Sequence, residues 1–198
     1  MQVDHSRENL PGAFARFLDG LEKLLAQQPA EARIVDEGGR LLGELVARDD
    51  WLPPAFAVPG AERYRQYPLY RDPAGRFSVV SFVWGPGQAT PIHDHTVWGL
   101  IGMLRGAEYS QGYRYAGPTT LARAGEPLRI DAGQVEAVSP RLGDIHRVHN
   151  AFDDRVSISI HVYGADIGSI PRSVYAEDGS RQDFVSGYSP LTTATESS

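Results

Sequence analysis

Three histidines stand at spacings that suit a metal site. His93 and His95 are separated by one residue, and His146 follows 51 residues after His95. Side chains two residues apart on a β-strand point to the same face, so His93 and His95 can act together. His146 can join them only if the fold pairs two distant strands. Three imidazoles on one face can bind iron, zinc, nickel or copper, and the sequence does not choose among these metals.

Three other side chains are not expected to coordinate the metal. His149 lies three residues beyond His146, which places it on the opposite face of a continuing strand. Asp94 lies between two predicted ligands and therefore points away from both. His5, near the start of the printed sequence, is not a predicted ligand either.

A second polar pattern follows near residue 160. Ser159, His161 and Tyr163 alternate with apolar residues, so on a strand they share one face. Polar groups turned into a protein interior must be hydrogen-bonded, because an unpaired polar group destabilises the fold. A Ser–His–Tyr chain satisfies these groups mutually. The pattern predicts a buried hydrogen-bonded chain, which can serve catalysis or only the structure of the core.

Short strands must position these residues. From residue 67 onward, apolar or alternating runs are separated by turns rich in Gly, Pro and Asp. Several antiparallel strands at this spacing predict a sandwich or a barrel. The predicted strands are 77–84, 98–104, 107–115, 127–130, 135–138, 146–150 and 156–163.

The region before the strands is expected to be helical. Apolar residues recur at three- and four-residue spacing between Phe14 and Leu25, with Pro11 near the helix start and Pro29 near its end. A second helix is expected over 41–48. We expect a single domain, in which a helical segment packs on a barrel and a polar, partly frayed tail follows; the three parts are 1–50, 51–185 and 186–198.

Composition excludes several classes of function. The formal net charge of −6 argues against a nucleic-acid partner, which favours a basic surface. No apolar run is long enough to span a bilayer, and the first residues do not resemble a signal peptide. The chain has no cysteine, which excludes disulfides and thiolate ligands. These features together predict a cytoplasmic protein, and they leave its oligomeric state open.

The histidine motifs resemble those of a known superfamily. The segment from Gly87 through His93 and His95 resembles the first cupin motif, and Pro140–Asn150 resembles the second. The position that normally holds a glutamate ligand holds Gly99. Loss of this ligand, together with the Ser–His–Tyr pattern that ends at Tyr163, resembles the cysteine dioxygenase family of thiol dioxygenases. The resemblance covers roughly residues 64–172.

The resemblance implies a fold, a metal and a mechanism. The fold is a cupin-type, jelly-roll-like antiparallel β-barrel, and the three histidines hold one Fe(II) per chain. Three neutral ligands leave the full ionic charge, which favours an anionic thiolate substrate. Tyr163, supported by His161 and Ser159, orients oxygen and substrate and handles a proton. In animal members the tyrosine is crosslinked to a cysteine at the position of Gly99, and this chain cannot form that bond.

The substrate prediction depends on two residues. Gln66 and Arg172 resemble the subgroup that oxidises 3-mercaptopropionate to 3-sulfinopropionate, with Arg172 binding the carboxylate bidentately. Trp98 is predicted to wall the pocket. An alignment slip of one residue puts Arg65 in place of Gln66, which implies L-cysteine as substrate and cysteine sulfinate as product.

Two other classes of function remain open at this point. The same histidines could hold a metal in a non-catalytic cupin or sensor domain, or serve a different metalloenzyme such as a Zn, Mn or Ni isomerase. The partners expected for the favoured class are O2 and a small thiol carboxylate, with neither nucleic acid nor membrane.

Overall fold

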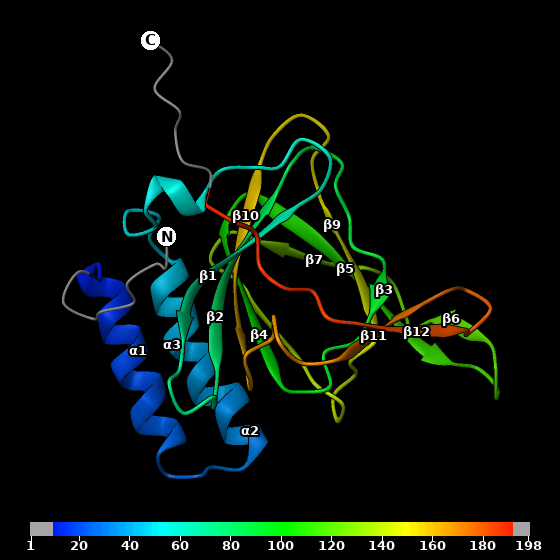
Figure 1. Cartoon of the computed structure of the whole chain (residues 1–198), viewed down its shortest axis with the longest axis horizontal. Coiled ribbons are helices and arrows are strands. Elements are labelled where there is room, and N and C mark those ends of the chain that lie inside the picture. Colours follow the sequence, from blue (N-terminus) through cyan, green and yellow to red (C-terminus); the bar gives the residue numbers. More distant parts are fainter. Residues whose placement is uncertain (1–9, 192–198) are drawn as a thin grey trace.

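The computed structural model describes residues 10–191, in which helices lie against one side of a β-barrel (Figure 1). Helix α1 spans Gly12–Leu25 and begins directly after Pro11, as predicted. Its apolar stripe is buried against the barrel. In the described part of the chain, no helix has the length and apolar character that crossing a membrane requires. His5 lies outside the described residues.

The second helical segment is longer than predicted. It comprises α2 (Glu31–Arg33), a π-helical turn (Ile34–Gly38) and α3 (Gly39–Val46), so it starts ten residues before the predicted helix 41–48. Glycine in a helix interior is intrinsically unfavourable, and tertiary packing outweighs that preference here. A Cβ atom at Gly38 would lie 3.0 Å from Leu100, so glycine lets this segment approach the sheet closely.

Two antiparallel sheets form the barrel. The sheet that carries the helices has five strands, in the spatial order β1 (Arg65–Arg71), β2 (Ser78–Trp84), β10 (Ser157–Tyr163), β4 (Gly99–Arg105) and β8 (Val135–Val138). The other sheet has the order β12 (Arg181–Phe184), β11 (Arg172–Tyr175), β3 (Ile92–His93), β9 (His146–Asn150), β5 (Ala107–Tyr115) and β6 (Leu121–Arg123), and β7 (Leu128–Asp131) pairs with β5. A short 3-10 turn at Pro54–Phe56 precedes β1.

Strands β2 and β10 are buried along their whole length, because the helices cover one face and the other faces the barrel interior. Their outward residues join the helices in a large apolar cluster, which includes Val83 and Ile160. Their inward residues face the barrel interior, where Phe82, Trp84 and Tyr163 form a second cluster. The polar side chains of β10 therefore point into the barrel, as the alternation predicted.

The predicted antiparallel barrel with N-terminal helices is confirmed, and each of the seven predicted strands is present within one residue of its expected bounds. Five further strands, β1, β3, β6, β11 and β12, were not predicted. Several are very short or polar: β3 has two residues, and β12 reads Arg-Gln-Asp-Phe. Such segments carry no periodic apolar signal, and their pairing depends on neighbours that are distant in sequence.

The described part of the predicted tail lies against the barrel. The Ser189 backbone N–H donates to the Gln66 carbonyl at 2.8 Å, and the Gln66 N–H donates to the Ser189 hydroxyl at 2.9 Å. Gly187 donates to the Gly168 carbonyl at 3.1 Å. These hydrogen bonds hold the first part of the tail beside β1 and Gly168. Residues 192–198 lie outside the described part of the chain.

The close contact between α3 and β4 generates a stability prediction. A Cβ atom at Gly102 would lie 2.8 Å from Leu42 and 2.9 Å from Val46, both on α3. We expect Gly102→Ala to reduce the free energy of unfolding by about 1–3 kcal/mol, because the added methyl overpacks this contact. Urea denaturation measures the change.

Gly112→Ala is the matched control, because it adds the same methyl to another strand. The Cβ atom there would meet its nearest neighbour at an ordinary 3.6 Å. Its free energy of unfolding should be unchanged or slightly higher. Equal destabilisation by both changes would show that the contact with α3 is not the cause.

Candidate metal centre

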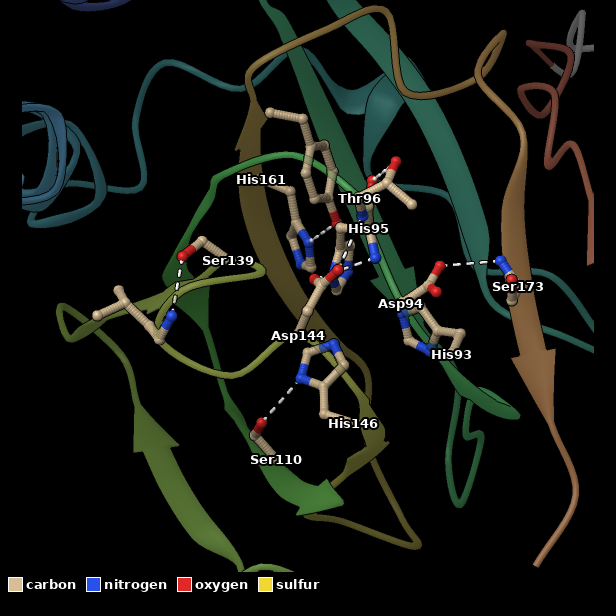
Figure 2. Close-up of polar contacts among 12 residues, drawn as sticks. His93, Asp94, His95, Thr96, Ser110, Ser139, Asp144, His146, His161 and Ser173 are labelled. Atoms are coloured by element: carbon tan, nitrogen blue, oxygen red, sulfur yellow. Dashed lines mark hydrogen bonds and ion pairs between the residues drawn. The ribbon is translucent and has the colours of Figure 1, made fainter. Parts of the chain in front are cut away.

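Strand pairing brings the three predicted ligands together. His93 on β3 is the direct register partner of His146 on β9, and His95 lies two residues beyond the end of β3. One ring nitrogen from each histidine lies within 4.8 Å of the other two, and all three side chains are buried. Figure 2 shows the three imidazoles converging from these two segments. The sequence correctly predicted which residues form the group.

Each imidazole is held through its Nδ1 atom. The partners are the Pro91 carbonyl at 3.0 Å for His93, the Asp144 carboxylate at 2.9 Å for His95, and the Ser110 hydroxyl at 3.1 Å for His146. The carbonyl and the carboxylate can only accept, so Nδ1 carries the proton in His93 and His95 and Nε2 is left free. The Ser110 hydroxyl can accept from Nδ1–H of His146, which gives the same tautomer there. The hydrogen bonds therefore orient three Nε2 lone pairs for one metal ion.

Asp144 supports the metal ligands and was not among the predicted site residues. Its Oδ1 accepts hydrogen bonds from the ring Nδ1 and the backbone N–H of His95, the latter at 3.0 Å. Its Oδ2 accepts from the Thr96 N–H at 2.8 Å (Figure 2). Thr96 has a positive φ of 61°, a backbone conformation that this carboxylate helps to hold. Its place two residues before His146, in the second motif, was the available signal.

Burial keeps the three imidazoles neutral. It lowers the pKa of His93 to about 4 and lowers the pKa of His95 and of His146 well below the ordinary value. A neutral imidazole offers its lone pair to a metal without first losing a proton. The donor set, three neutral nitrogens in one small space, therefore fits a divalent transition metal.

Asp94 and His149 lie away from the group, as predicted. The carboxylate of Asp94 accepts a hydrogen bond from the Ser173 N–H at 2.8 Å and another from the Tyr175 hydroxyl at 2.6 Å. It thereby ties β3 to β11. The ring of His149 stacks on Tyr109, with 5.2 Å between the ring centroids.

The predicted Ser–His–Tyr chain is present inside the barrel. Ser159 Oγ lies 2.8 Å from His161 Nε2, and His161 Nδ1 lies 2.7 Å from the Tyr163 hydroxyl. The Tyr163 ring stacks on His95 with 5.3 Å between centroids, so the chain runs up to the metal ligands. Trp84 adds a hydrogen bond from its indole N–H to Ser159 at 3.0 Å.

The departure from the first cupin motif at Gly99 has a steric reason. Gly99 pairs with Tyr163 across β4 and β10. A Cβ atom at position 99 would lie 3.1 Å from the Tyr163 ring and 3.0 Å from Val138. A side chain there would force the Tyr163 ring or Val138 to shift, so this close packing favours glycine at the position.

Two buried carboxyl groups were not among the predicted site residues. Glu108 on β5 accepts a hydrogen bond from the Ser159 hydroxyl at 2.9 Å and is completely buried. Burial raises the pKa of Glu108 to about 8 and the pKa of Glu136 on β8 to about 7. A hydrogen bond from Ser110, the partner of His146, lowers the pKa of Glu136 in part. From sequence, these glutamates resemble ordinary strand carboxylates.

Two of the predicted substrate residues lie beside the site. Gln66 is the register partner of Phe82, whose ring stacks on His161 at a centroid distance of 4.0 Å, so Gln66 is on the inner face of its strand. Arg172 is buried, and its charge adds to the burial that lowers the pKa of His93 and opposes the burial that raises the pKa of Tyr163. Its Nε has no hydrogen-bond partner among the described residues.

Trp98 lies elsewhere, contrary to the prediction. It packs against the apolar cluster that the helices form with the outer face of the sheet. Gly99, its neighbour, faces Tyr163 inside the barrel, and adjacent residues of a strand face opposite sides. Trp98 therefore supports the core on the helical side and does not wall the metal site.

A cavity of about 330 Å³ borders Pro91, two residues before His93, and none of the three ligand histidines lines it. Its lining includes Gln66 and Pro91, whose carbonyl holds His93, and it continues to the segment 186–190. Two of its described lining residues, Arg63 and Arg65, are cationic, and none is acidic. The cavity is therefore cationic in character.

A β-barrel of this topology with histidines converging from β3 and β9 defines a cupin-type metal-binding protein. The model of the family described as cysteine dioxygenase type I matches residues 13–172. The chain therefore belongs to the cysteine dioxygenase type I family, whose general activity is thiol dioxygenation.

Comparison with solved structures finds several proteins of low sequence identity. An uncharacterised double-stranded β-helix protein from Klebsiella pneumoniae is 14% identical, with 69% of this chain and 97% of that chain covered and a TM-score of 0.46. A Cupin 2 conserved barrel domain protein from Salinispora arenicola is 20% identical, with 58% and 86% covered and a TM-score of 0.42. A protein from Thermus thermophilus is 16% identical, with 60% and 98% covered and a TM-score of 0.45.

The contact between Asp144 and His95 generates a prediction about metal affinity. Asp144→Ala removes the acceptor that fixes the His95 tautomer. We expect Zn²⁺ affinity to fall about 10–100-fold, the range typical of a lost partner behind a metal ligand. Competition titration against a chelator measures the affinity. Asp154→Ala is the control, because Asp154 is exposed and pairs with its neighbour Arg155, and equal losses in both variants would contradict the assignment.

The raised pKa of each buried glutamate predicts a pH-dependent stability. Between pH 4.5 and about 8 the folded chain keeps a proton on Glu108 that the unfolded chain has released. The free energy of unfolding is therefore highest below this window. It falls by about 1.4 kcal/mol per pH unit for one group as the pH rises through the window. Glu108→Gln should remove this slope, and Glu136→Gln should remove one that ends at about pH 7.

Urea denaturation at a series of pH values measures this dependence. Glu126→Gln serves as the control, because Glu126 is exposed and its substitution should leave the slope unchanged. If Glu108→Gln and the wild type showed parallel stability profiles, Glu108 would not be protonated in the folded state near pH 7.

Proposed function

We propose that the chain is an Fe(II)-dependent thiol dioxygenase that adds both atoms of O2 to the sulfur of 3-mercaptopropionate, giving 3-sulfinopropionate. The observation that carries this proposal is the three-histidine group beside the chain formed by Ser159, His161 and Tyr163. Among the described residues, no carboxylate joins the metal-ligand group. Family membership supports the general activity, and the residues around the site support the substrate.

His93, His95 and His146 would hold the metal through Nε2. When bound, Fe(II) supplies coordination sites for a thiolate and O2 and the electron transfer between them. Because the three ligands are neutral, they do not reduce the charge that attracts the thiolate. The protein holds these ligands in fixed tautomers and excludes water from their surroundings.

Tyr163 and His161 both remain in their neutral forms. Burial raises the pKa of Tyr163 and lowers the pKa of His161 well below its ordinary value. Tyr163 therefore acts as a hydrogen-bonding phenol and not as a phenolate. It would orient the reacting groups and hold a proton close to them, while His161 orients the phenol.

Arg172 and Gln66 would bind the substrate carboxylate. The guanidinium of Arg172 lies over the Phe184 ring at 4.7 Å, so it is held in place while its Nε is available as a donor. Gln66 pairs with Phe82 on the inner face of the sheet, whereas Arg65 pairs with Val83, a member of the outer apolar cluster. The register supports the alignment that favours 3-mercaptopropionate over L-cysteine, although the Arg65 side chain also borders the cavity.

Oxygen uptake by the iron-loaded protein tests the proposal. We expect kcat/KM to be higher for 3-mercaptopropionate than for L-cysteine. Arg172→Met should lower kcat/KM for 3-mercaptopropionate about 10–100-fold, mainly through KM, because a charge-assisted hydrogen bond to the carboxylate is lost. Arg123→Met, which changes an exposed arginine on β6, is the matched control.

Three outcomes would contradict parts of this proposal. A preference for L-cysteine would overturn the substrate assignment. Unchanged thiol-dependent uptake after Tyr163→Phe would exclude the phenol from the reaction. Absence of uptake with either thiol would favour a non-catalytic cupin or an isomerase, and metal analysis would then identify the resident ion.

A further inference from the structure

The Ser159 hydroxyl has three hydrogen-bonding neighbours, and this number restricts its orientation. They are the indole N–H of Trp84 at 3.0 Å, Glu108 Oε2 at 2.9 Å and His161 Nε2 at 2.8 Å. A serine hydroxyl donates one hydrogen bond and accepts two. The indole can only donate. Of the two remaining neighbours, one must therefore donate to Ser159 and the other must accept from it.

With an ionised Glu108, the direction of the chain is determined. A carboxylate only accepts, so Ser159 donates to Glu108 and His161 Nε2–H donates to Ser159. A neutral imidazole has one proton, so its Nδ1 is then bare and accepts the Tyr163 proton across 2.7 Å. In this state Tyr163 presents only lone pairs to the metal site.

With a protonated Glu108, every hydrogen bond in the chain reverses. The Glu108 O–H donates to Ser159, and Ser159 donates to His161 Nε2. The imidazole proton then lies on Nδ1 and is donated to the Tyr163 oxygen. The Tyr163 proton is free to point into the metal site. A proton on Oε1 of Glu108 would have no acceptor among the described residues, so Oε2 is the favoured position.

We propose that Glu108 is a positioning residue whose proton sets the direction of the hydrogen-bond chain and so decides whether Tyr163 donates or only accepts a hydrogen bond at the metal site. The reversal is a property of the hydrogen bonds among Glu108, Ser159, His161 and Tyr163. Its consequence for catalysis rests on the proposed function. Glu108 acts through Ser159 and His161 and does not touch the reacting atoms.

The surroundings of Glu108 place this reversal close to neutral pH. Burial is the main cause that raises the pKa of Glu108 to about 8, the hydrogen bond from Ser159 lowers this pKa in part, and Glu136 on β8 raises it further. The other titratable groups near it, His161 and Tyr163 on β10, stay neutral. Tyr163 is therefore a donor at pH 7 and loses this role as the medium becomes alkaline.

The tautomer of His161 reports the direction directly. Nitrogen-15 NMR of the full-length chain, metal-free and loaded with diamagnetic Zn²⁺, distinguishes Nδ1–H from Nε2–H, and a His161→Asn variant assigns the signals. In the wild type we expect Nδ1–H below pH 8 and Nε2–H above it. A single tautomer on both sides of this midpoint would overturn the proposal.

Two variants that cannot titrate test the cause. Glu108→Met leaves Ser159 with one acceptor, His161 Nε2, so the Nδ1–H tautomer should persist at all pH values. Glu108→Gln keeps a polar side chain of the same shape and should also abolish the pH dependence. The exposed control Glu126→Gln should keep the wild-type switch. A switch at the same pH in either Glu108 variant would overturn the proposal.

Enzyme kinetics separate this inference from the proposed function. The alkaline decrease in kcat for O2 uptake should occur in the wild type and be lost in Glu108→Gln. A tautomer switch without any thiol-dependent uptake would support the role of Glu108 and contradict the proposed activity. Uptake without a tautomer switch would support the activity and contradict the role of Glu108.

Discussion

The direct pairing of His93 with His146 is the constraint on which the rest of the site depends. It joins two strands that are far apart in sequence and places their imidazoles on one face. A shift of one residue would turn either histidine to the opposite face. Strand β3 has only two residues, so this register is held by supports outside the strand, such as the contact of Asp94 with β11 and that of Asp144 with His95.

Burial then determines the chemical state of each group around the ligands. It keeps the imidazoles and the Tyr163 phenol neutral and favours the proton on Glu108. In such surroundings an unpaired polar atom is costly, so the polar side chains of β10 are joined in one continuous hydrogen-bonded chain. The same requirement that stabilises the interior also connects Glu108 on β5 to the phenol beside the metal ligands.

Space links the metal ligands to the hydrogen-bonded chain. Gly99 has no side chain, and the ring of Tyr163 lies where a larger residue would extend. Glycine at position 99 therefore has two effects: it provides no carboxylate ligand, and it leaves room for the phenol of Tyr163. They act in the same direction, because the first preserves the charge of the metal and the second adds a neutral hydrogen-bonding group beside it.

Local periodicity in the sequence alone determined seven strands and the amphipathic first helix. It also determined that His93 shares a face with His95, and Ser159 with Tyr163. Alternation shows which face a residue occupies but does not identify its neighbour across the barrel. Only the tertiary structure decided that Asp144 and Glu108 complete the site and that Trp98 lies outside it. These contacts join segments that are distant in the chain, and short polar strands such as β3 and β12 gain their structure from such pairing and from no apolar period of their own.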